Sequence, residues 1–367
     1  MQLSVGIVGL PNVGKSTLFN ALTQKAVPAE NYPFCTIDPA VGIVPVPDNR
    51  IDTLTKLSDS AETIPAVVEF VDIAGLVKGA AEGEGLGNKF LSNIREVDMI
   101  AHVVRIFDDE DLHHVSGVVD PAEDMKVINL ELILADLQTI NKRLETLERD
   151  KKRGDKEAVE LAAVCERVRQ HLEAERLACE LELSDRESEL VRPLQLLTMK
   201  PMLFVVNKKY DAYNLDESND ERWQELVAYW QERGMSYTIV DAGVEAELSS
   251  LTPDERNEFR REYGSQDSGI DQLIKDAYQH LGLISYFTTG EKETRAWTIR
   301  QGSTAPEAGA AIHSDFRDKF IRAQVVSFVD LVEAGSMNAV REQGKLRTEG
   351  KEYTVQNGDV IEFLHGG

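Results

Sequence analysis

The chain has 367 residues, of which 42% are hydrophobic and 7% aromatic, and its formal net charge is −24. This composition is typical of a folded protein of two or three domains and excludes a largely disordered chain. The strong negative charge argues against broad, charge-driven binding of nucleic acid by the whole surface. We therefore expect no DNA partner, while a local basic patch would still be compatible with the composition.

The three cysteines, Cys35, Cys165 and Cys179, have spacings that match no metal-binding or redox motif. We interpret them as reduced thiols and expect a cytoplasmic protein. The N-terminus has no signal-peptide pattern, and no apolar run approaches the ~18 residues that a membrane-spanning helix needs. We expect no membrane partner.

The most specific motif runs from Gly9 to Ser16, with the sequence GLPNVGKS. It has the spacing G-x-x-x-x-G-K-[ST], follows a predicted buried strand over 2–8 and precedes a predicted helix over 14–24. The glycines allow consecutive backbone N–H groups to surround phosphate oxygens, and the positive end of the helix points at the same place. Lys15 would reach the β- and γ-phosphates, and Ser16 would bind Mg²⁺. The alternative is a Gly-rich turn, which does not account for strand, loop and helix in this register.

Two further positions match the Mg²⁺ and γ-phosphate contacts of such a protein. Thr36 lies in a loop with two prolines and is predicted to close on Mg²⁺ and the γ-phosphate, the alternative being a threonine that caps a turn. Asp72 follows a predicted strand over 66–71 and is predicted to hold Mg²⁺ through water. The backbone N–H of Gly75, three residues later, would meet the γ-phosphate.

The orientation of the attacking water is less clear from the motifs. Leu76 stands where Ras-like enzymes carry a water-orienting glutamine, and the stretch 75–87 is rich in glycine, which predicts a loop that changes conformation. After a predicted strand over 99–107 come His113 and His114. A histidine just beyond a strand end could orient water, and the alternative is two ordinary loop histidines.

From residue 121 to 198 the apolar residues recur at helical spacing on both sides of a charged turn at 151–155. This pattern predicts a helical hairpin, with the second helical run ending near Leu183. Between Lys142 and Lys156 there are seven Lys or Arg residues and four Asp or Glu residues. The tip is therefore locally positive, and either a solvated turn or an RNA-facing surface would explain it.

A predicted strand over 201–206 ends in Asn207-Lys-Lys-Tyr-Asp211. Guanine-specific proteins place N-K-x-D here, because the aspartate accepts both ring N–H donors of guanine. Tyr210 occupies the fourth position and Asp211 comes one residue late, so guanine specificity is not secured. A further strand is predicted over 236–240.

The tail from 286 to 364 has its own short strands, predicted over 296–300, 321–328, 353–355 and 360–363, and one helix over 306–313. This pattern indicates a separate small α+β domain.

Taken together, these segments resemble the YchF group of Obg-like ATPases almost from end to end. The resemblance is carried by GIVGLPNVGKSTLFNAL, NYPFCTIDP, FVDIAGLVKGA, GSTAPEAGAAIHSDF and GDVIEF. It implies an α/β P-loop NTPase domain over 1–280 with a mixed, mostly parallel sheet. It also implies a helical-hairpin insertion over 121–198 and a small ubiquitin-like TGS domain over 281–367.

The resemblance also implies ATP hydrolysis and a set of site residues. His114, within the phrase HVSG, would take the catalytic duty together with Lys15, and we also consider K⁺ beside Asn12. Asn207 and the main chain of Lys208 would meet the adenine, although the family usually shows N-x-x-E and Tyr210 replaces that glutamate. The residues expected around the phosphates and Mg²⁺ are Asn12, Val13, Gly14, Lys15, Ser16, Thr17, Thr36, Asp72 and Gly75.

The sequence therefore predicts a Mg²⁺-dependent ATPase that acts as a nucleotide-controlled switch and associates with the ribosome or ribosomal RNA. Two alternatives stay open: an Obg-type GTPase, and a nucleotide-gated ribosome or RNA adaptor in which hydrolysis is incidental.

Overall fold

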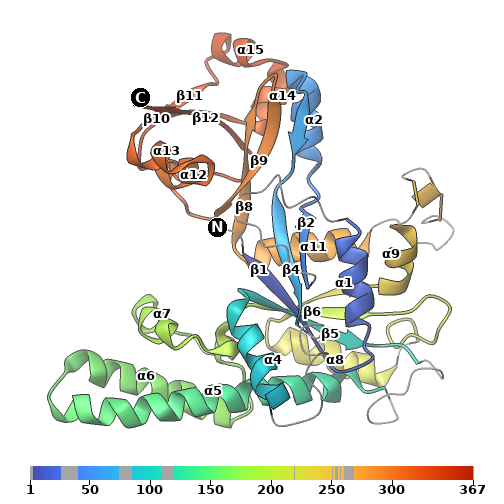
Figure 1. Ribbon diagram of the computed structural model, residues 1–367, viewed down its shortest axis with the longest axis vertical. Coiled ribbons are helices and arrows are strands. Elements are labelled where there is room, and N and C mark those ends of the chain that lie inside the picture. The colour runs from blue at the N-terminus through green and yellow to red at the C-terminus, as the bar shows by residue number, and fades with distance from the viewer. Residues whose placement is uncertain are drawn as a thin grey trace.

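The computed structural model describes residues 3–25, 40–73, 85–108, 119–218, 220–249, 251–252, 255–256, 258–259 and 268–366. Two six-stranded sheets form the body, and a long helical hairpin projects from one side of the first (Figure 1). The second sheet lies at the opposite end of the molecule from the hairpin.

The first sheet has the strand order β2-β4-β1-β5-β6-β7. Only β2 runs antiparallel to its neighbour, so the sheet is mixed and mostly parallel, as the sequence predicts. Its strands are β1 (Ser4–Val8), β2 (Val41–Pro45), β4 (Val67–Asp72), β5 (Met99–Arg105), β6 (Met202–Asn207) and β7 (Ser236–Val240).

Helices cover both faces of this sheet, which explains why every residue of β5 is buried. On one face, Met99, Ala101 and Val103 share an apolar core with α1 (Lys15–Thr23) and α11 (Gly269–His280). The other face packs against α4 (Gly85–Glu96), α5 (Pro121–Lys152) and α8 (Glu221–Glu232). The carboxyl ends of the parallel strands therefore lie together on one side of the sheet that these helices leave uncovered, which we call the open edge.

The hairpin consists of α5 and α6 (Lys156–Glu173), joined by a turn with Gly154 at φ 84° and Asp155 as the N-cap. The second helix ends at Glu173 and not near Leu183, because Glu175 adopts a left-handed φ of 57° that stops the helix. The buried Asp136 carboxylate accepts bonds from the Leu197 and Thr198 backbone at 2.8 Å, which ties the returning chain to α5. The short elements in between are η2 (Ala178–Glu180), α7 (Asp185–Val191), η3 (Arg192–Leu194) and η4 (Leu197–Met199).

The second sheet has the order β11-β10-β12-β8-β9-β3. The predicted strand at Tyr353–Val355 is wrong, because Thr354 forms only an isolated bridge with Thr304 and the Asp359 carboxylate holds this loop instead. The elements are β8 (Leu283–Thr289), β9 (Glu293–Arg300), α12 (Ala305–Ile312), α13 (Ser314–Asp318), β10 (Phe320–Ser327), α14 (Phe328–Ala334), α15 (Met337–Glu342), β11 (Arg347–Glu349) and β12 (Asp359–His365).

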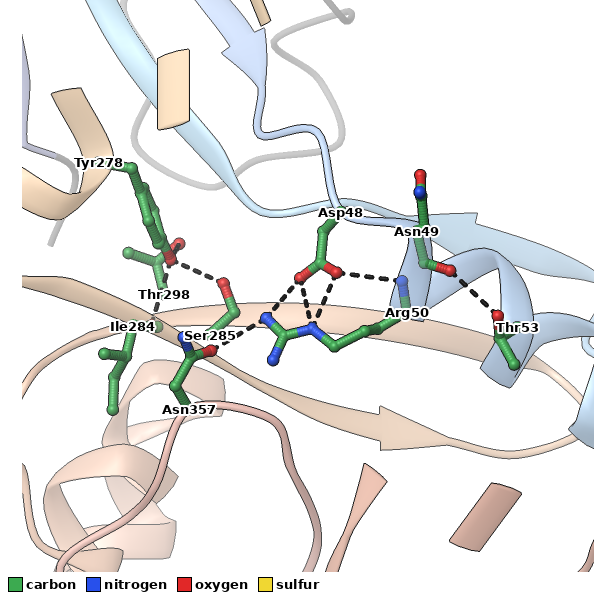
Figure 2. Close-up of polar contacts among 9 residues, drawn as sticks. All are labelled: Asp48, Asn49, Arg50, Thr53, Tyr278, Ile284, Ser285, Thr298 and Asn357. Atoms are coloured by element: carbon green, nitrogen blue, oxygen red, sulfur yellow. Dashed lines mark hydrogen bonds and ion pairs between the residues drawn. The ribbon is translucent and has the colours of Figure 1, made fainter. Parts of the chain in front are cut away.

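One strand of the second sheet comes from the N-terminal part of the chain. β3 (Glu62–Ile64) pairs in parallel with β9, and α2 (Asn49–Ser58) precedes it. Figure 2 shows Arg50 of α2 between the Asp48 carboxylate and the Asn357 side chain, whose Oδ1 accepts a bond of 2.9 Å. The Arg50 guanidinium also lies 5.1 Å from the Phe287 ring centroid. The connection between β2 and β4 therefore belongs to the second sheet, because β3 pairs with it and α2 packs against it.

In the part of the chain that the structure describes, no helix combines the length and hydrophobicity needed to cross a membrane.

Candidate nucleotide-binding site

The loop between β1 and α1 lies at the open edge of the first sheet. Three residues of this loop have positive φ angles: Gly9 at 151°, Asn12 at 64° and Gly14 at 98°. Such angles favour glycine and are tolerated by asparagine, and they turn the backbone so that consecutive N–H groups can face one ligand. The helix α1 then begins at Lys15, so its positive end faces the same space.

Lys15 folds back over this loop. Its Nζ lies 2.5 Å from the Leu10 carbonyl oxygen, and only 8% of the residue is exposed. Val13 is buried, Ser16 is half-buried, and Thr17 is exposed. The loop thus presents an ammonium group and a hydroxyl beside the turned backbone, which is an arrangement suited to a phosphate chain and its cation.

Asp72 is the last residue of β4 and lies beside the loop strand, since it pairs in register with Ile7. It is 6% exposed, and its backbone N–H donates to the Ala40 carbonyl oxygen at 2.9 Å. Mg²⁺ prefers oxygen ligands and is commonly held by one or two protein oxygens together with phosphates and water. A hydroxyl at Ser16 and a carboxylate at Asp72 are oxygen donors of the kind that this ion prefers. Among the described residues, no group of three or more His, Cys, Asp or Glu side chains is arranged to hold a metal ion.

Asn207 ends β6 and joins two parts of the site. Its Nδ2 donates to the Val13 carbonyl oxygen at 2.9 Å, and its Oδ1 accepts from the Ala242 backbone N–H at 3.1 Å. Ala242 is the first residue of α9 (Ala242–Leu248), and Asn207 itself is 5% exposed. The amide therefore braces the phosphate loop against the next strand-to-helix turn. Its expected contact with the base stays a prediction.

Lys208 follows Asn207 directly at the end of β6. Its backbone N–H is taken by the Val240 carbonyl oxygen at 2.9 Å, so a main-chain contact with a base would come from the carbonyl oxygen. Its Nζ pairs with Glu217 at 2.8 Å. Partial burial lowers the pKa of this ammonium, but the bond to Glu217 and nearby carboxylates outweigh that effect and raise it.

The loop after Lys208 contains a left-handed residue and an exposed tyrosine. Asp211 has a left-handed φ of 60°, and Tyr210 is 53% exposed. The carboxylate of Asp241 accepts the Tyr210 backbone N–H at 2.6 Å and also caps α9 through Val244. Burial raises the pKa of Asp241, and its bonds to backbone N–H groups oppose that shift.

Three of the predicted site residues, Thr36, Gly75 and His114, lie outside the described residues. The structure brings the other predicted residues together at the open edge of the sheet: the loop from Asn12 to Thr17, Asp72, Asn207 and Lys208. Their roles toward a nucleotide stay predictions.

His102 was not anticipated from the sequence, because it sits inside an apolar strand pattern. It is 1% exposed, its ring lies 5.3 Å from that of Phe204, and its Nδ1 has no hydrogen-bond partner among the described residues. Burial, with a smaller contribution from the charge of Lys15, lowers the pKa of His102 to about 3. The imidazole is therefore neutral behind the phosphate loop.

This buried histidine predicts acid sensitivity. An unfolded histidine binds a proton near pH 6.5 and the folded one only near pH 3, so stability is full above 6.5 and falls as the pH drops between these values. From pH 7 to pH 5, we expect the free energy of unfolding of the His102→Met variant to fall by about 2 kcal/mol less than that of the unmodified chain. Urea unfolding at both pH values measures this, with the exposed His313→Asn as a control. Equal losses in all three proteins would contradict the assignment.

The fold and this loop define the class of the protein. A G-x-x-x-x-G-K-S loop between the first strand of a mostly parallel sheet and its helix, with an aspartate ending the neighbouring strand, is the arrangement of P-loop nucleoside-triphosphate-binding proteins. Residues 4–130 match the family described as a 50S ribosome-binding GTPase, and residues 283–365 match the YchF-GTPase C-terminal family.

Relatives that match almost the whole chain identify the family within this class. The chain is 50% identical over 363 residues to the ribosome-binding ATPase YchF of Bacillus subtilis, covering 99% of both chains. It is 47% identical over 364 residues to the protein of the same name from Escherichia coli O157:H7, again with 99% of both covered. The structure of the Schizosaccharomyces pombe YchF GTPase superposes with a TM-score of 0.90 at 37% identity, covering 99% of this chain and 98% of that one. The chain belongs to the YchF family.

Proposed function

We propose that this protein is a Mg²⁺-dependent ATPase that works as a nucleotide-controlled switch on the ribosome. The observation that carries the proposal is the phosphate loop at the sheet edge, with Lys15 and Ser16 at the start of α1 and Asp72 at the end of the strand that neighbours β1. The family adds the choice of reaction and partner, since its bacterial members are named ribosome-binding ATPases.

In this proposal each residue does one task. The backbone from Asn12 to Thr17 and the Lys15 ammonium bind and orient the phosphates. Ser16, Thr36 and Asp72 hold Mg²⁺, which when bound neutralises charge that develops on the phosphates. Gly75 donates a backbone N–H to the γ-phosphate, and His114 orients the attacking water. K⁺ beside Asn12 belongs to the same proposal.

The proposed organisation is a P-loop domain over 1–280, the hairpin insertion over 121–198 and a TGS domain over 281–367. The match of residues 283–365 to the YchF-GTPase C-terminal family supports the last boundary. The tip of the hairpin is the proposed ribosome-facing element, although some of its cations pair within the helix: Lys151 lies 2.6 Å from Glu148 and Arg153 lies 3.5 Å from Asp150.

GTP hydrolysis is the second candidate, and a specific observation favours it. The structurally matched S. pombe relative is named a GTPase, and Asn207 and Lys208 match the first two positions of the guanine-reading pattern N-K-x-D. Against it, the fourth position of that pattern is Tyr210, and the carboxylate of Asp211 comes one residue later.

Hydrolysis of ATP and GTP by the purified chain, with and without Mg²⁺, tests the proposal. We expect Mg²⁺-dependent turnover and a higher kcat/KM for ATP. A preference for GTP of ten-fold or more, about 1.4 kcal/mol, would overturn the choice of nucleotide. Sedimentation with ribosomes in the ATP, ADP and nucleotide-free states tests the partner. Association that follows the nucleotide while His114→Ala leaves hydrolysis unchanged would favour the adaptor alternative.

A further inference from the structure

The side chain of Asn214 closes the loop that follows β6. Its Oδ1 accepts the Lys209 backbone N–H at 3.1 Å, and its Nδ2 donates to the Lys209 and Ala212 carbonyl oxygens at 2.9 and 3.2 Å. The opposite orientation of the amide would set its NH₂ group against an N–H and its oxygen against two carbonyl oxygens, so these partners assign the orientation. The side chain therefore bonds both backbone polar groups of Lys209, as a neighbouring strand would.

Asn214 is itself fixed to the end of β5. It is 4% exposed, and it pairs with Phe107 in an isolated antiparallel bridge. Beside this bridge, Leu215 donates its backbone N–H to the Ile106 carbonyl oxygen at 2.9 Å, and Ile106 donates to the Asn207 carbonyl oxygen at 3.1 Å. Because Asn207 also bonds the phosphate loop, these contacts hold the loop over 208–213 in a defined place relative to the phosphate loop.

Three consecutive N–H groups of this loop are bonded within the protein. Lys208 donates to a carbonyl oxygen of β7 at 2.9 Å, and Lys209 donates to the Asn214 side chain. Tyr210 donates to the Asp241 carboxylate at 2.6 Å. The main chain over 208–210 therefore offers a ligand its carbonyl oxygens, which are hydrogen-bond acceptors, while its N–H donors already have partners.

The two purine bases need different partners from such a loop. Position 6 of adenine carries an amino group, which donates hydrogen bonds, whereas position 6 of guanine carries an oxygen, which accepts them. A loop whose N–H groups are already bonded leaves the guanine oxygen without a donor, and an unpaired polar group in a binding site costs affinity. The hydrogen-bonding state of the loop over 208–210 thus matches adenine.

We propose that Asn214 is a specificity-determining residue: by bonding the N–H and C=O groups of Lys209, it keeps the loop over 208–213 in a form that accepts an adenine amino group and gives no donor to guanine. The inference rests on the proposed function and deepens it, since it concerns the base of the nucleotide that the phosphate loop binds. Asn214 acts through the main chain and is a positioning residue. It lies beyond the four-residue motif that begins at Asn207, so that motif alone does not select the base.

The affinities of the full chain for ADP and GDP in the presence of Mg²⁺, measured by calorimetry, test the inference without requiring hydrolysis. We expect the unmodified chain to prefer ADP. In Asn214→Ala the Lys209 N–H loses its acceptor and can turn toward a guanine oxygen. The ratio of the ADP affinity to the GDP affinity should then fall about tenfold, roughly the effect of one hydrogen bond. In ATP hydrolysis KM should rise while kcat stays within about threefold, because the phosphate loop is unchanged.

Asn214→Asp separates the two halves of the amide. The carboxylate can still accept the Lys209 N–H, but its second oxygen faces the Lys209 and Ala212 carbonyl oxygens and repels them. This variant should bind both nucleotides more weakly and keep the affinity ratio within about threefold of the original.

Two further variants separate base selection from folding. Asn129→Ala is the matched control for removing a buried amide, because Asn129 is 5% exposed and lies on α5. It should keep both affinities. Asn214→Ser retains a polar group but is too short to bond both backbone groups of Lys209, so it should lower the ratio even if the alanine variant does not fold. The thermal unfolding midpoint of each nucleotide-free variant shows whether it is folded.

The outcomes distinguish this inference from the proposed function. An unmodified chain that prefers ADP, with folded Asn214→Ala and Asn214→Ser that keep this preference, overturns the inference and leaves the function. Equal weakening of ADP and GDP binding in these variants overturns it as well, because Asn214 would then support the site without selecting the base. Loss of the preference in Asn214→Asp would remove the role of the Lys209 N–H. An unmodified chain that prefers GDP tenfold or more overturns the choice of ATP in the proposed function, and the inference with it.

Discussion

Nucleotide binding is expected to fall below detection when Gly14 is replaced by alanine. Gly14 has a φ of 98°, and an added Cβ would lie 2.1 Å from the Nδ2 atom of Asn207. Asn207 cannot move aside without losing its bonds to Val13 and Ala242, which are 2.9 and 3.1 Å long. The strain therefore falls on the phosphate loop, whose N–H groups must converge on one ligand. Calorimetric titration with ADP and Mg²⁺ measures the loss.

Gly154→Ala provides the matched control for this substitution. Gly154 has a similar φ of 84°, but nothing lies within 4 Å of its added Cβ, and it sits in the hairpin turn. Its replacement should cost about 1–2 kcal/mol of stability from backbone strain and leave the affinity for ADP unchanged. Wild-type affinity in Gly14→Ala would show that the loop tolerates the displacement of Asn207 and would contradict the expectation.

Removing the Lys15 charge is expected to lower kcat/KM for ATP by a factor on the order of 10² to 10³, the range measured when one group that stabilises a developing charge is deleted. Lys15→Met keeps the length and apolar stem of the side chain, which is only 8% exposed, and removes the ammonium that would meet the β- and γ-phosphates. Turnover at saturating and limiting ATP separates the loss of binding from the loss of rate.

Lys25→Met is the control, because it makes the same replacement of lysine by methionine outside the phosphate loop. Lys25 follows α1 and pairs with Asp271 at 2.6 Å, away from the loop. It should keep the hydrolysis rate within about a factor of two, since it touches neither the phosphates nor their support. A Lys15→Met protein that hydrolyses ATP at the original rate would remove Lys15 from the catalytic set.

The agreement between the predicted elements and the observed ones varies along the chain. The strand predicted over 236–240 and the helix predicted over 306–313 agree with β7 and α12 within a residue, because an apolar run and a Pro near the N-terminus are local signals. Strand β3 has only three residues and pairs with β9, more than 200 residues away, so no local pattern could assign it to the second sheet. The predicted end of α6 near Leu183 is wrong, because the left-handed residue that stops the helix, Glu175, is not a glycine and gives no local signal.

The amino-acid sequence by itself determined that the chain has a phosphate loop, since the contacts with phosphate come from consecutive residues whose order is the motif. The change from helical to strand periodicity also predicts a separate C-terminal domain. Only the tertiary structure decided how that loop is supported. Asn207 braces it from another strand, and α2 with β3 joins the region between β2 and β4 to the second sheet. These contacts join residues far apart in the chain, and their pairing depends on the packing of the sheets, which no local pattern encodes.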